Sequence, residues 1–326
     1  MILPEYLHPD MQILLDARES VGGTPVGEKT TVAYRAFWEL YYRAMPNPRP
    51  DTIEAVDRMV PLNKQTEGHA QGYDIPVRIY RSADMPPLAP CVIYLHGGGF
   101  VLGDLESSDI LAWGFTAEAD AVTISVDYRL APEHPYPAAL EDTYAVLCWA
   151  HDNAAELGID PGRIALVGDS AGGCLTTAAC LISNEQDGPP VVAQVMIYPV
   201  TGIALDSPSY IENADAVGLT AASMKFFLEN YLQRPADWAD PLARPILAAT
   251  ADLGRLPPAF VHTAQYDPIR DDGRKYAALL ASSGCDVTYR EVPGMIHGFY
   301  RLRLASAAAA HEFSLVCDFL KRAWSV

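Results

Sequence analysis

The chain has no long apolar run and no pattern of paired cysteines. No stretch approaches the roughly 18 consecutive apolar residues that a membrane span requires. The opening segment MILPEYLHPDMQ has neither the basic region nor the apolar core of a signal peptide. The cysteines are scattered without a C-x-x-C pair, which argues against disulfides and against a metal site. We therefore expect a cytoplasmic protein with free thiols, no metal and no membrane contact. The cysteines are Cys91, Cys148, Cys174, Cys180, Cys285 and Cys317.

Basic residues are also few. The 23 Lys and Arg residues stand against 41 Asp and Glu residues, which gives a formal net charge of −18. Because nucleic acids and anionic membrane surfaces attract positive charge, we expect neither as a partner. The 326 residues, half of them hydrophobic, suffice for one large α/β domain or two ordinary ones.

The stretch Gly168-Asp-Ser-Ala-Gly172 is the strongest motif. It follows an apolar run, 164–167, and precedes a segment of small residues, 173–181, that suits a helix. Strand, tight turn and helix form the context in which G-x-S-x-G predicts a nucleophile elbow. A serine on so sharp a turn has strained backbone, and a side chain at either glycine would collide with a neighbouring element. We predict Ser170 as a nucleophile. From the motif alone, an ordinary glycine-rich turn stays open.

A second glycine cluster, His96-Gly-Gly-Gly-Phe100, stands at the end of a predicted strand. Successive glycines leave backbone N–H groups unshielded, as the oxyanion of acyl transfer requires. With the residue after the serine, the predicted oxyanion-hole donors are Gly98, Gly99 and Ala171. A flexible turn is the alternative. We expect His96 to hold the shape of this loop.

Strands alternate with helices along most of the chain, which predicts a mostly parallel sheet with helices on both faces. The functional turns follow the third, fifth, seventh and eighth of the eight predicted strands. Because the carboxyl ends of parallel strands share one edge of a sheet, these turns should meet. The strands are predicted near 53–60, 75–81, 91–96, 121–127, 164–167, 191–198, 259–264 and 285–292.

Two further strand ends supply an acid and a base. Asp267 follows the seventh strand, and His297 lies in a glycine-flanked loop after the eighth. Serine, then acid, then histidine is the α/β-hydrolase order. His297 would accept the proton of Ser170, and Asp267 would orient the imidazole. Asp271 and Asp272 compete for the acid role, but they are better placed as the N-cap and first turn of the next helix.

Other polar residues are expected to be structural. Asp169 should make a structural hydrogen bond in the elbow. The remaining histidines lack a glycine-flanked loop after a strand, so surface or packing roles are expected for His8, His69, His134, His151, His262 and His311.

Two segments fall outside the strand–helix alternation. Residues 1–50 predict helices, and 201–245 carry several prolines and a helix candidate that begins at Thr220. We predict that 201–245 leaves the sheet and covers the site; the family resemblance described below implies that the helices of 1–50 belong to the same cap, over a catalytic core of 51–200 and 246–326. The helix in the first segment has an aromatic face that either packs on a core or roofs a ligand pocket. This face contains Tyr34, Phe37, Trp38, Tyr41, Tyr42 and Met45.

With these motifs in place, the chain resembles the hormone-sensitive-lipase-like carboxylesterases of bacteria. The likeness extends over about residues 70–325. It implies an eight-stranded α/β-hydrolase core with a helical cap. It also implies hydrolysis of short- to medium-chain acyl esters without a cofactor, and the aromatic cap extends this to aryl esters. The matching motifs are His96–Phe100 with Val101–Asp104, Asp127–Glu133, Gly168–Gly172, Tyr266–Asp271 and Ile296–Phe299.

The substrate is expected to be a small ester, and four residues are candidates for pocket walls: Tyr198, Leu219, Phe227 and Phe299. Ordinary core positions are the alternative for each of them. Three rival functions stay open: an amidase or peptidase, a long-chain lipase, and a non-catalytic receptor. The plant gibberellin receptors resemble the same family but lack the catalytic histidine, whereas His297 is present here. Relatives of this kind often form homodimers, so a homodimer is possible.

Overall fold

The computed structural model describes residues 6–23, 30–45, 47–62, 73–202 and 204–325. One eight-stranded sheet crosses its centre in the order β1-β2-β4-β3-β5-β6-β7-β8. Strand β2 is antiparallel to β1 and to β4, and every other neighbouring pair is parallel. The predicted α/β fold with a mostly parallel sheet is therefore confirmed. The strands are β1 (Ile53–Pro61), β2 (Asp74–Ser82), β3 (Ala89–Leu95), β4 (Val122–Val126), β5 (Ile159–Asp169), β6 (Ala193–Ile197), β7 (Ala259–Tyr266) and β8 (Val287–Ile296).

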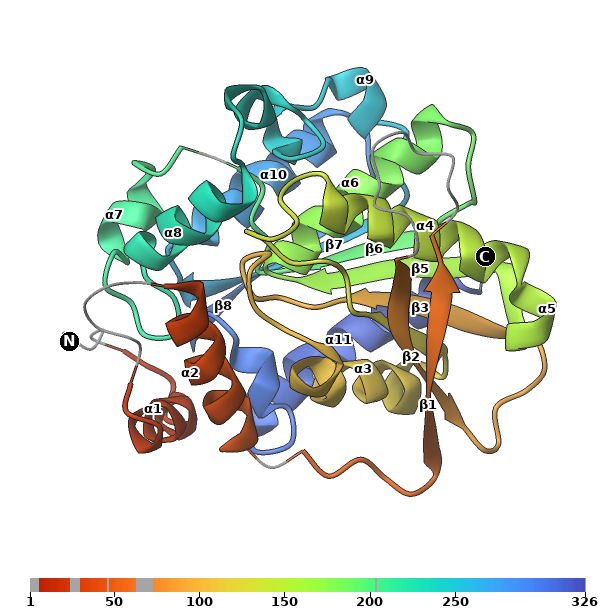
Figure 1. Cartoon of the computed structure of the whole chain (residues 1–326), viewed down its shortest axis with the longest axis horizontal. Helices are drawn as coiled ribbons and strands as arrows, with labels where there is room; N and C mark the ends of the chain where they lie inside the picture. The colour runs from red at the N-terminus through yellow and green to blue at the C-terminus, as the bar shows by residue number, and fades with distance from the viewer. Residues whose placement is uncertain (1–5, 24–29, 46, 63–72, 203, 326) are drawn as a thin grey trace.

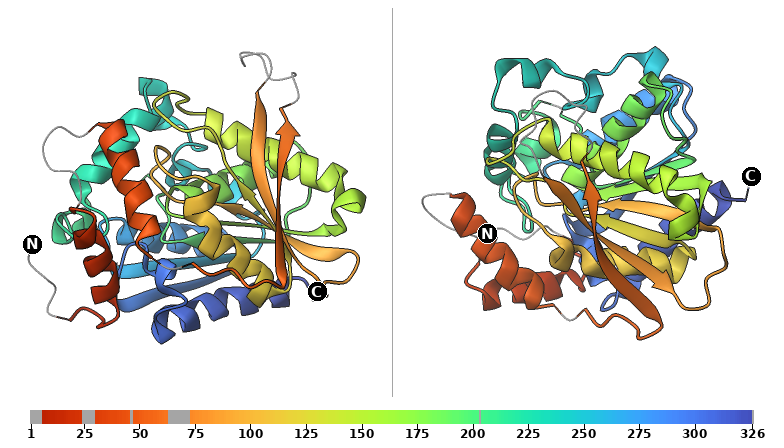
Figure 2. Two further views of the ribbon diagram at one scale, coloured as in Figure 1. Left: turned by 60° about the horizontal axis from the view of Figure 1, so that its bottom comes forward. Right: turned by 45° about the vertical axis from the view of Figure 1, so that its right-hand side comes forward.

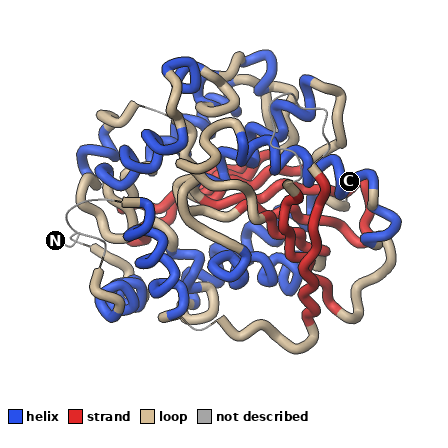
Figure 3. Tube along the Cα trace, viewed as in Figure 1, coloured by secondary structure: helices blue, strands red, loops and turns tan. Residues whose placement is uncertain are grey.

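Helices cover both faces of this sheet (Figures 1 and 3). Their apolar residues form two clusters of buried side chains, one on each face. Figure 2 shows the sheet from two other directions, with β1 and β2 at one edge. One face carries α4 (Ala138–Asp152), α6 (Ala171–Glu185) and α10 (Arg270–Ser282), and the other carries α3 (Leu105–Ala119) and α11 (Ala307–Ala323).

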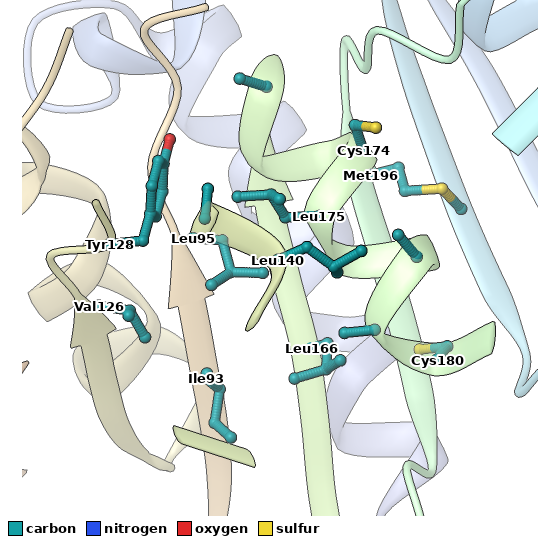
Figure 4. Packing of buried hydrophobic residues seen from close by; sticks show 14 of the residues in the cluster. Ile93, Leu95, Val126, Tyr128, Leu140, Leu166, Cys174, Leu175, Cys180 and Met196 are labelled. Carbon is teal, nitrogen blue, oxygen red and sulfur yellow. The ribbon is translucent and has the colours of Figure 1, made fainter. Parts of the chain in front are cut away.

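The central strands are apolar on both sides because helices bury both sides. Every residue of β4 and β6 is buried, whereas most of the edge strand β1 is not. Figure 4 shows the packing on one face, where Ile93, Leu95 and Leu166 of neighbouring strands lie close to Leu140 of α4 and Leu175 of α6. This rigid layer holds the strand ends in place.

Strand β8 is longer than predicted. The prediction ends it at residue 292 because Pro293 and Gly294 suggest a turn, but the strand continues to Ile296. Pairing with β7 shifts register between Ala264 and Tyr266, and Gly294 adopts a φ of +73° within this irregularity. As a result, the residue after Ile296 stands directly at the strand end.

Helices from two distant parts of the chain lie together beyond the carboxyl ends of β7 and β8 (Figure 1). They are α1 (Met11–Ser20), α2 (Thr31–Arg43), α7 (Pro208–Glu212) and α8 (Ala221–Tyr231). A hydrogen bond of 3.0 Å between the Tyr34 and Ser223 hydroxyls joins α2 to α8. Thr220 caps α8 by accepting from the N–H of Ser223, as its sequence predicts.

The N-cap prediction for the helix after β7 is wrong. Helix α10 begins at Arg270, and Asp271 and Asp272 lie in its first turn. Their carboxylates accept hydrogen bonds from another segment: Asp271 from the N–H of Ser209, and Asp272 from the N–H of Thr201. Both aspartates therefore bind the segment that leaves the sheet after β6.

The remaining elements are short. They are α5 (Ala154–Leu157), α9 (Thr250–Leu253), and the 3-10 helices η1 (Pro235–Ala239), η2 (Pro245–Leu247) and η3 (Phe299–Leu302). The six cysteines are free thiols. Over the described ranges, no helix has the length and apolar character needed to cross a membrane. The same ranges contain no group of three His, Cys, Asp or Glu side chains placed to hold a metal ion.

Candidate active site

Ser170 stands between β5 and α6 in a strained backbone conformation. Its φ of 56° and ψ of −114° lie outside the regions that non-glycine residues ordinarily occupy. The Ser170 N–H donates to the carbonyl of Ile197 at 2.8 Å, and its own carbonyl accepts from the N–H of Val200 at 3.2 Å. Hydrogen bonds to β6 and to the segment just after it therefore hold the backbone of the serine on both sides.

The two glycines of the elbow have no room for a side chain. A Cβ atom on Gly168 would lie 2.2 Å from the carbonyl oxygen of Gly172. A Cβ atom on Gly172 would lie 1.9 Å from the carbonyl oxygen of Leu95 in β3. Strand β3, the elbow and α6 thus contact one another backbone to backbone. A side chain at either glycine would collide with a neighbouring element, as the sequence predicts.

A chain of hydrogen bonds joins Ser170 to His297 and Asp267. The Ser170 Oγ lies 3.1 Å from His297 Nε2, and His297 Nδ1 lies 2.7 Å from Asp267 Oδ2. The second carboxylate oxygen of Asp267 accepts from the N–H of Ile269 at 3.0 Å. Because the fully buried carboxylate accepts from Nδ1, Nε2 is left to accept the serine proton. This is the arrangement of an activated nucleophile, its base and an orienting group.

The glycine loop after β3 presents unused backbone donors. Gly98 and Gly99 have φ values of +127° and +63°, which L side chains rarely adopt. No described residue accepts a hydrogen bond from either N–H group. Ala171 is the first residue of α6, a position whose N–H has no intrahelical acceptor. The three predicted oxyanion-hole donors are thus free to bind an oxyanion.

Buried side chains fix the shape of this loop. Asp169 Oδ1 accepts from the N–H of Gly97 at 2.8 Å and from the hydroxyl of Tyr94 at 2.6 Å. Burial raises the pKa of Tyr94 well above its ordinary value and the neighbouring carboxylate raises it further, so the hydroxyl stays protonated and donates. The ring of His96 stacks on Tyr128 at 4.2 Å, and the Tyr128 hydroxyl donates to the His96 carbonyl. Asp169 and His96 therefore occupy structural positions.

A cavity opens at Ser170 and His297 between the sheet edge and helices α1, α2 and α8. Four aromatic residues of α2 line it, so the aromatic face roofs a pocket. Helix α8 closes the opposite side so tightly that a Cβ atom on Gly99 would lie 2.4 Å from the Phe227 ring. The lining residues are Arg18, Tyr34, Phe37, Trp38, Tyr41, Gly98, Gly99, Leu102, Ser170, Gly218, Leu219, Ser223, Met224, Phe227, His297, Gly298 and Arg301.

The predicted pocket walls divide into two pairs. Leu219 and Phe227 line the cavity. Tyr198 and Phe299 do not, which corrects their prediction as walls: they are buried and pack on each other with ring centres 5.7 Å apart. The Tyr198 ring also lies 4.6 Å from that of His297, so it supports the imidazole from within the core.

Two arginines of the cavity were missed. Arg18 and Arg301 come from opposite ends of the chain, and no motif or periodicity marks either of them. Among the histidines assigned packing or surface roles, His262 is fully buried with Nε2 3.0 Å from a carboxylate oxygen of Glu312. His69 lies outside the described residues.

Comparison with known proteins agrees with this geometry. A family model described as the alpha/beta hydrolase fold matches residues 92–301. The chain belongs to the α/β-hydrolase family. It is 44% identical over 264 residues to carboxylesterase NlhH of Mycobacterium tuberculosis, which covers 80% of this chain and 82% of NlhH. It is 39% identical over 255 residues to an ethyl acetate hydrolase of Pseudomonas putida, which covers 77% of this chain and 79% of the relative.

A solved structure extends the match to the whole chain. A thermostable esterase from Pseudomonas putida ECU1011 superposes with a TM-score of 0.89 at 30% identity and covers 98% of both chains. The predicted relationship to hormone-sensitive-lipase-like carboxylesterases is confirmed by these relatives.

Substituting an elbow glycine tests the close backbone contact. We expect Gly172→Ala to lower the free energy of unfolding by about 3 kcal/mol or more, because its methyl group meets the carbonyl of Leu95. Gly162→Ala in β5, the strand that precedes the elbow, is the control: its nearest neighbour is the movable Asp160 carboxylate at 3.3 Å, so a change within about 0.5 kcal/mol is expected. Chemical denaturation measures both. Equal free energies of unfolding for the two variants would show that Gly172 is not in close contact with the backbone of β3.

Proposed function

We propose that the protein is a serine carboxylesterase that hydrolyses short- to medium-chain acyl or aryl esters. The observation that carries this proposal is the continuous hydrogen-bonded chain from Ser170 through His297 to Asp267 at the wall of an apolar cavity. Ser170, at the start of this hydrogen-bonded series, lies beside backbone N–H groups that have no acceptor. A nucleophile and an oxyanion site therefore adjoin the same cavity. Relatives with esterase names support the same reaction class.

In the first half-reaction, Ser170 Oγ attacks the ester carbonyl carbon while His297 Nε2 accepts the serine proton. The tetrahedral intermediate collapses when the alkoxy C–O bond breaks, and His297 returns the proton to the leaving alcohol. Water then attacks the acyl-serine with the same base, and the carboxylic acid leaves. Asp267 keeps the imidazole in the right tautomer and stabilises the imidazolium. No cofactor enters either half-reaction.

The oxyanion of both intermediates would accept hydrogen bonds from the N–H groups of Gly98, Gly99 and Ala171. One such donor contributes about 3 kcal/mol to transition-state stabilisation. The positive end of α6 points at the same place and adds to this effect. Leu219 and Phe227 are proposed to contact the substrate. The aromatic walls from α2 and α8 favour apolar groups, which is the basis for proposing acyl and aryl esters.

Two further proposals concern the setting of the enzyme. A cytoplasmic location is consistent with six unpaired thiols, which persist in a reducing compartment. A homodimer is proposed from the family resemblance alone.

Replacement of the serine tests the nucleophile. Wild-type protein is expected to hydrolyse p-nitrophenyl butyrate in the presence of EDTA, and Ser170→Ala should lower kcat by about 10⁵-fold or more because no other group can form the acyl-enzyme. Ser282→Ala, at the exposed end of α10, is the control and should keep wild-type activity. Nitrophenolate release measures both. A Ser170→Ala variant that keeps most of the wild-type activity would contradict the proposal. Cleavage of anilides in preference to esters would indicate an amidase instead.

A pair of aspartate variants tests which carboxylate orients the histidine. Asp267→Asn should lower kcat by about 10⁴-fold, because an amide favours the wrong imidazole tautomer. Asp271→Asn should affect mainly stability, since its carboxylate accepts from the N–H of Ser209 rather than from His297. Steady-state kinetics and thermal unfolding separate the two effects. A larger loss of kcat in Asp271→Asn than in Asp267→Asn would reverse the assignment.

A further inference from the structure

The cavity holds two arginines that ester hydrolysis does not itself require. Arg18 of α1 and Arg301 of η3 line the same space as Ser170 and His297, and both are buried, with 9% and 8% of their surface exposed. Among the described lining residues, none carries a carboxylate. Arginine keeps its charge at any ordinary pH. An otherwise largely apolar cavity therefore carries two positive charges, in a protein whose net charge is −18.

Arg301 has few partners for a buried cation. Its guanidinium carries five N–H donors. One of them, on Nη1, donates to the carbonyl of Ser107 at 2.8 Å, and the guanidinium carbon lies 4.6 Å from the ring centre of Trp38. In the part of the chain that the structure describes, no carboxylate lies within ion-pair distance of Arg301. A buried charge without a counter-ion is unfavourable, so the remaining donors suit an incoming anion.

Neighbouring groups add unused donors. Burial raises the pKa of Tyr41, while Arg301 and Arg18 both act to lower it, so both positive charges lie close enough to act on this hydroxyl. Within the described ranges, no residue shares a hydrogen bond with the Tyr41 hydroxyl, and the buried Nε1 of Trp38 has no acceptor. The indole of Trp38 and the phenol of Tyr41 thus line the same cavity as the Arg301 guanidinium, and the Trp38 N–H has no acceptor among the described residues.

The position of these groups relates them to the reacting atoms. Arg301 lies in the turn that follows His297, and Arg18 Nη1 donates to the carbonyl of Gly218 at 3.1 Å. Gly218 itself lies against the His297 backbone, where a Cβ atom would be 2.8 Å from the carbonyl oxygen. Ser170, His297 and the two arginines therefore line one cavity, with Gly218 in contact with both Arg18 and His297.

We propose that the preferred substrate is an ester that also carries a carboxylate, and that Arg301 binds this carboxylate while Ser170 attacks the ester carbonyl. The planar guanidinium fork matches a carboxylate, and Arg18 contributes a second positive charge. This inference rests on the proposed esterase function and narrows its substrate class. The carboxylate can belong to the acyl part or to the alcohol part of the ester, and the experiment separates these two cases.

Two pairs of matched esters test the inference. The first pair is monoethyl adipate, with a carboxylate on the acyl part, and its neutral primary amide, ethyl adipamate. The second pair is 4-(butanoyloxy)butanoate, with the carboxylate on the alcohol part, and its primary amide. Titration of released acid at neutral pH gives kcat/KM for each ester. The wild type should prefer the carboxylate over the amide by about tenfold or more in one pair, as a charge-assisted hydrogen-bonded pair requires.

Variants then assign the preference to Arg301. Within each variant, the carboxylate-to-amide ratio of kcat/KM is compared, so that a general loss of activity cancels. Arg301→Gln should bring the ratio close to one, mainly through KM, and Arg301→Lys should keep part of it because the charge remains without the fork. Arg274→Gln is the control: this arginine pairs with Glu291 outside the cavity and its variant should keep the wild-type ratio. If Arg301→Gln does not fold, the reduced ratio in Arg301→Lys makes the same test.

The outcomes separate this inference from the function on which it rests. A wild type that cleaves the ester bond of both neutral, amide-bearing esters, yet shows no preference for the carboxylate-bearing ester in either pair, would overturn the inference alone. A preference that survives in Arg301→Gln would also overturn it. A folded wild type that is inert on all four esters and on p-nitrophenyl butyrate would overturn the esterase function and the inference with it.

Discussion

The backbone contact at the elbow is the constraint on which the rest of the site depends. Ser170 keeps its strained conformation because Gly168 and Gly172 let β5, α6 and β3 approach without side chains between them. The same approach brings the glycine loop after β3 beside the first turn of α6. The proposed nucleophile and the proposed oxyanion donors are therefore positioned by one packing contact, and the strain is offset by the buried sheet around it.

Asp169 extends this constraint into the loop. Its carboxylate accepts from the N–H of Gly97 and from the Tyr94 hydroxyl, so the residue next to the nucleophile also anchors the oxyanion loop. On the other side, Tyr198 packs against the ring of His297 and fixes the base from within the core. The ends of β3 and β5 thus support each other, as do those of β6 and β8, and motion of any one of the four would disturb the reacting geometry.

We propose that the helices beyond the ends of β7 and β8 form a cap that gives the hydrolase core its substrate selectivity. Helices α2 and α8 meet through the hydrogen bond between Tyr34 and Ser223, and their aromatic residues form part of the cavity wall. The apolar wall suits ester groups in general. In our proposal, the two arginines of the cavity distinguish between substrates by charge, because burial strengthens their interactions.

Sequence patterns predict the parts of this site that lie at strand ends. Ser170, Asp267 and His297 could be placed because parallel strands bring their carboxyl ends to one edge of the sheet. Assigning a residue to that edge does not require knowing which way its side chain points. Tyr198 and Phe299 were misplaced for the complementary reason. Being next to a strand end or to His297 in sequence does not determine whether a ring turns into the cavity or into the core.

Other features depend on contacts between distant segments. The prediction ended β8 too early because Pro293 and Gly294 resemble a turn, whereas the positive φ of Gly294 lets the strand continue through an irregularity. Arg18 and Arg301 could not be foreseen, since only the folded cap brings α1 and η3 to the same cavity. Their function depends on the neighbours they meet there rather than on any local pattern.

Covalent trapping of the nucleophile tests the central claim most directly. Diethyl p-nitrophenyl phosphate reacts with an activated serine and leaves a stable phosphoryl ester on its oxygen. We predict one diethylphosphoryl group per chain, located by peptide mass spectrometry on Ser170, and loss of esterase activity in proportion to labelling. Labelling of any other residue in step with the loss of activity, or full labelling of Ser170 with activity retained, would contradict the account.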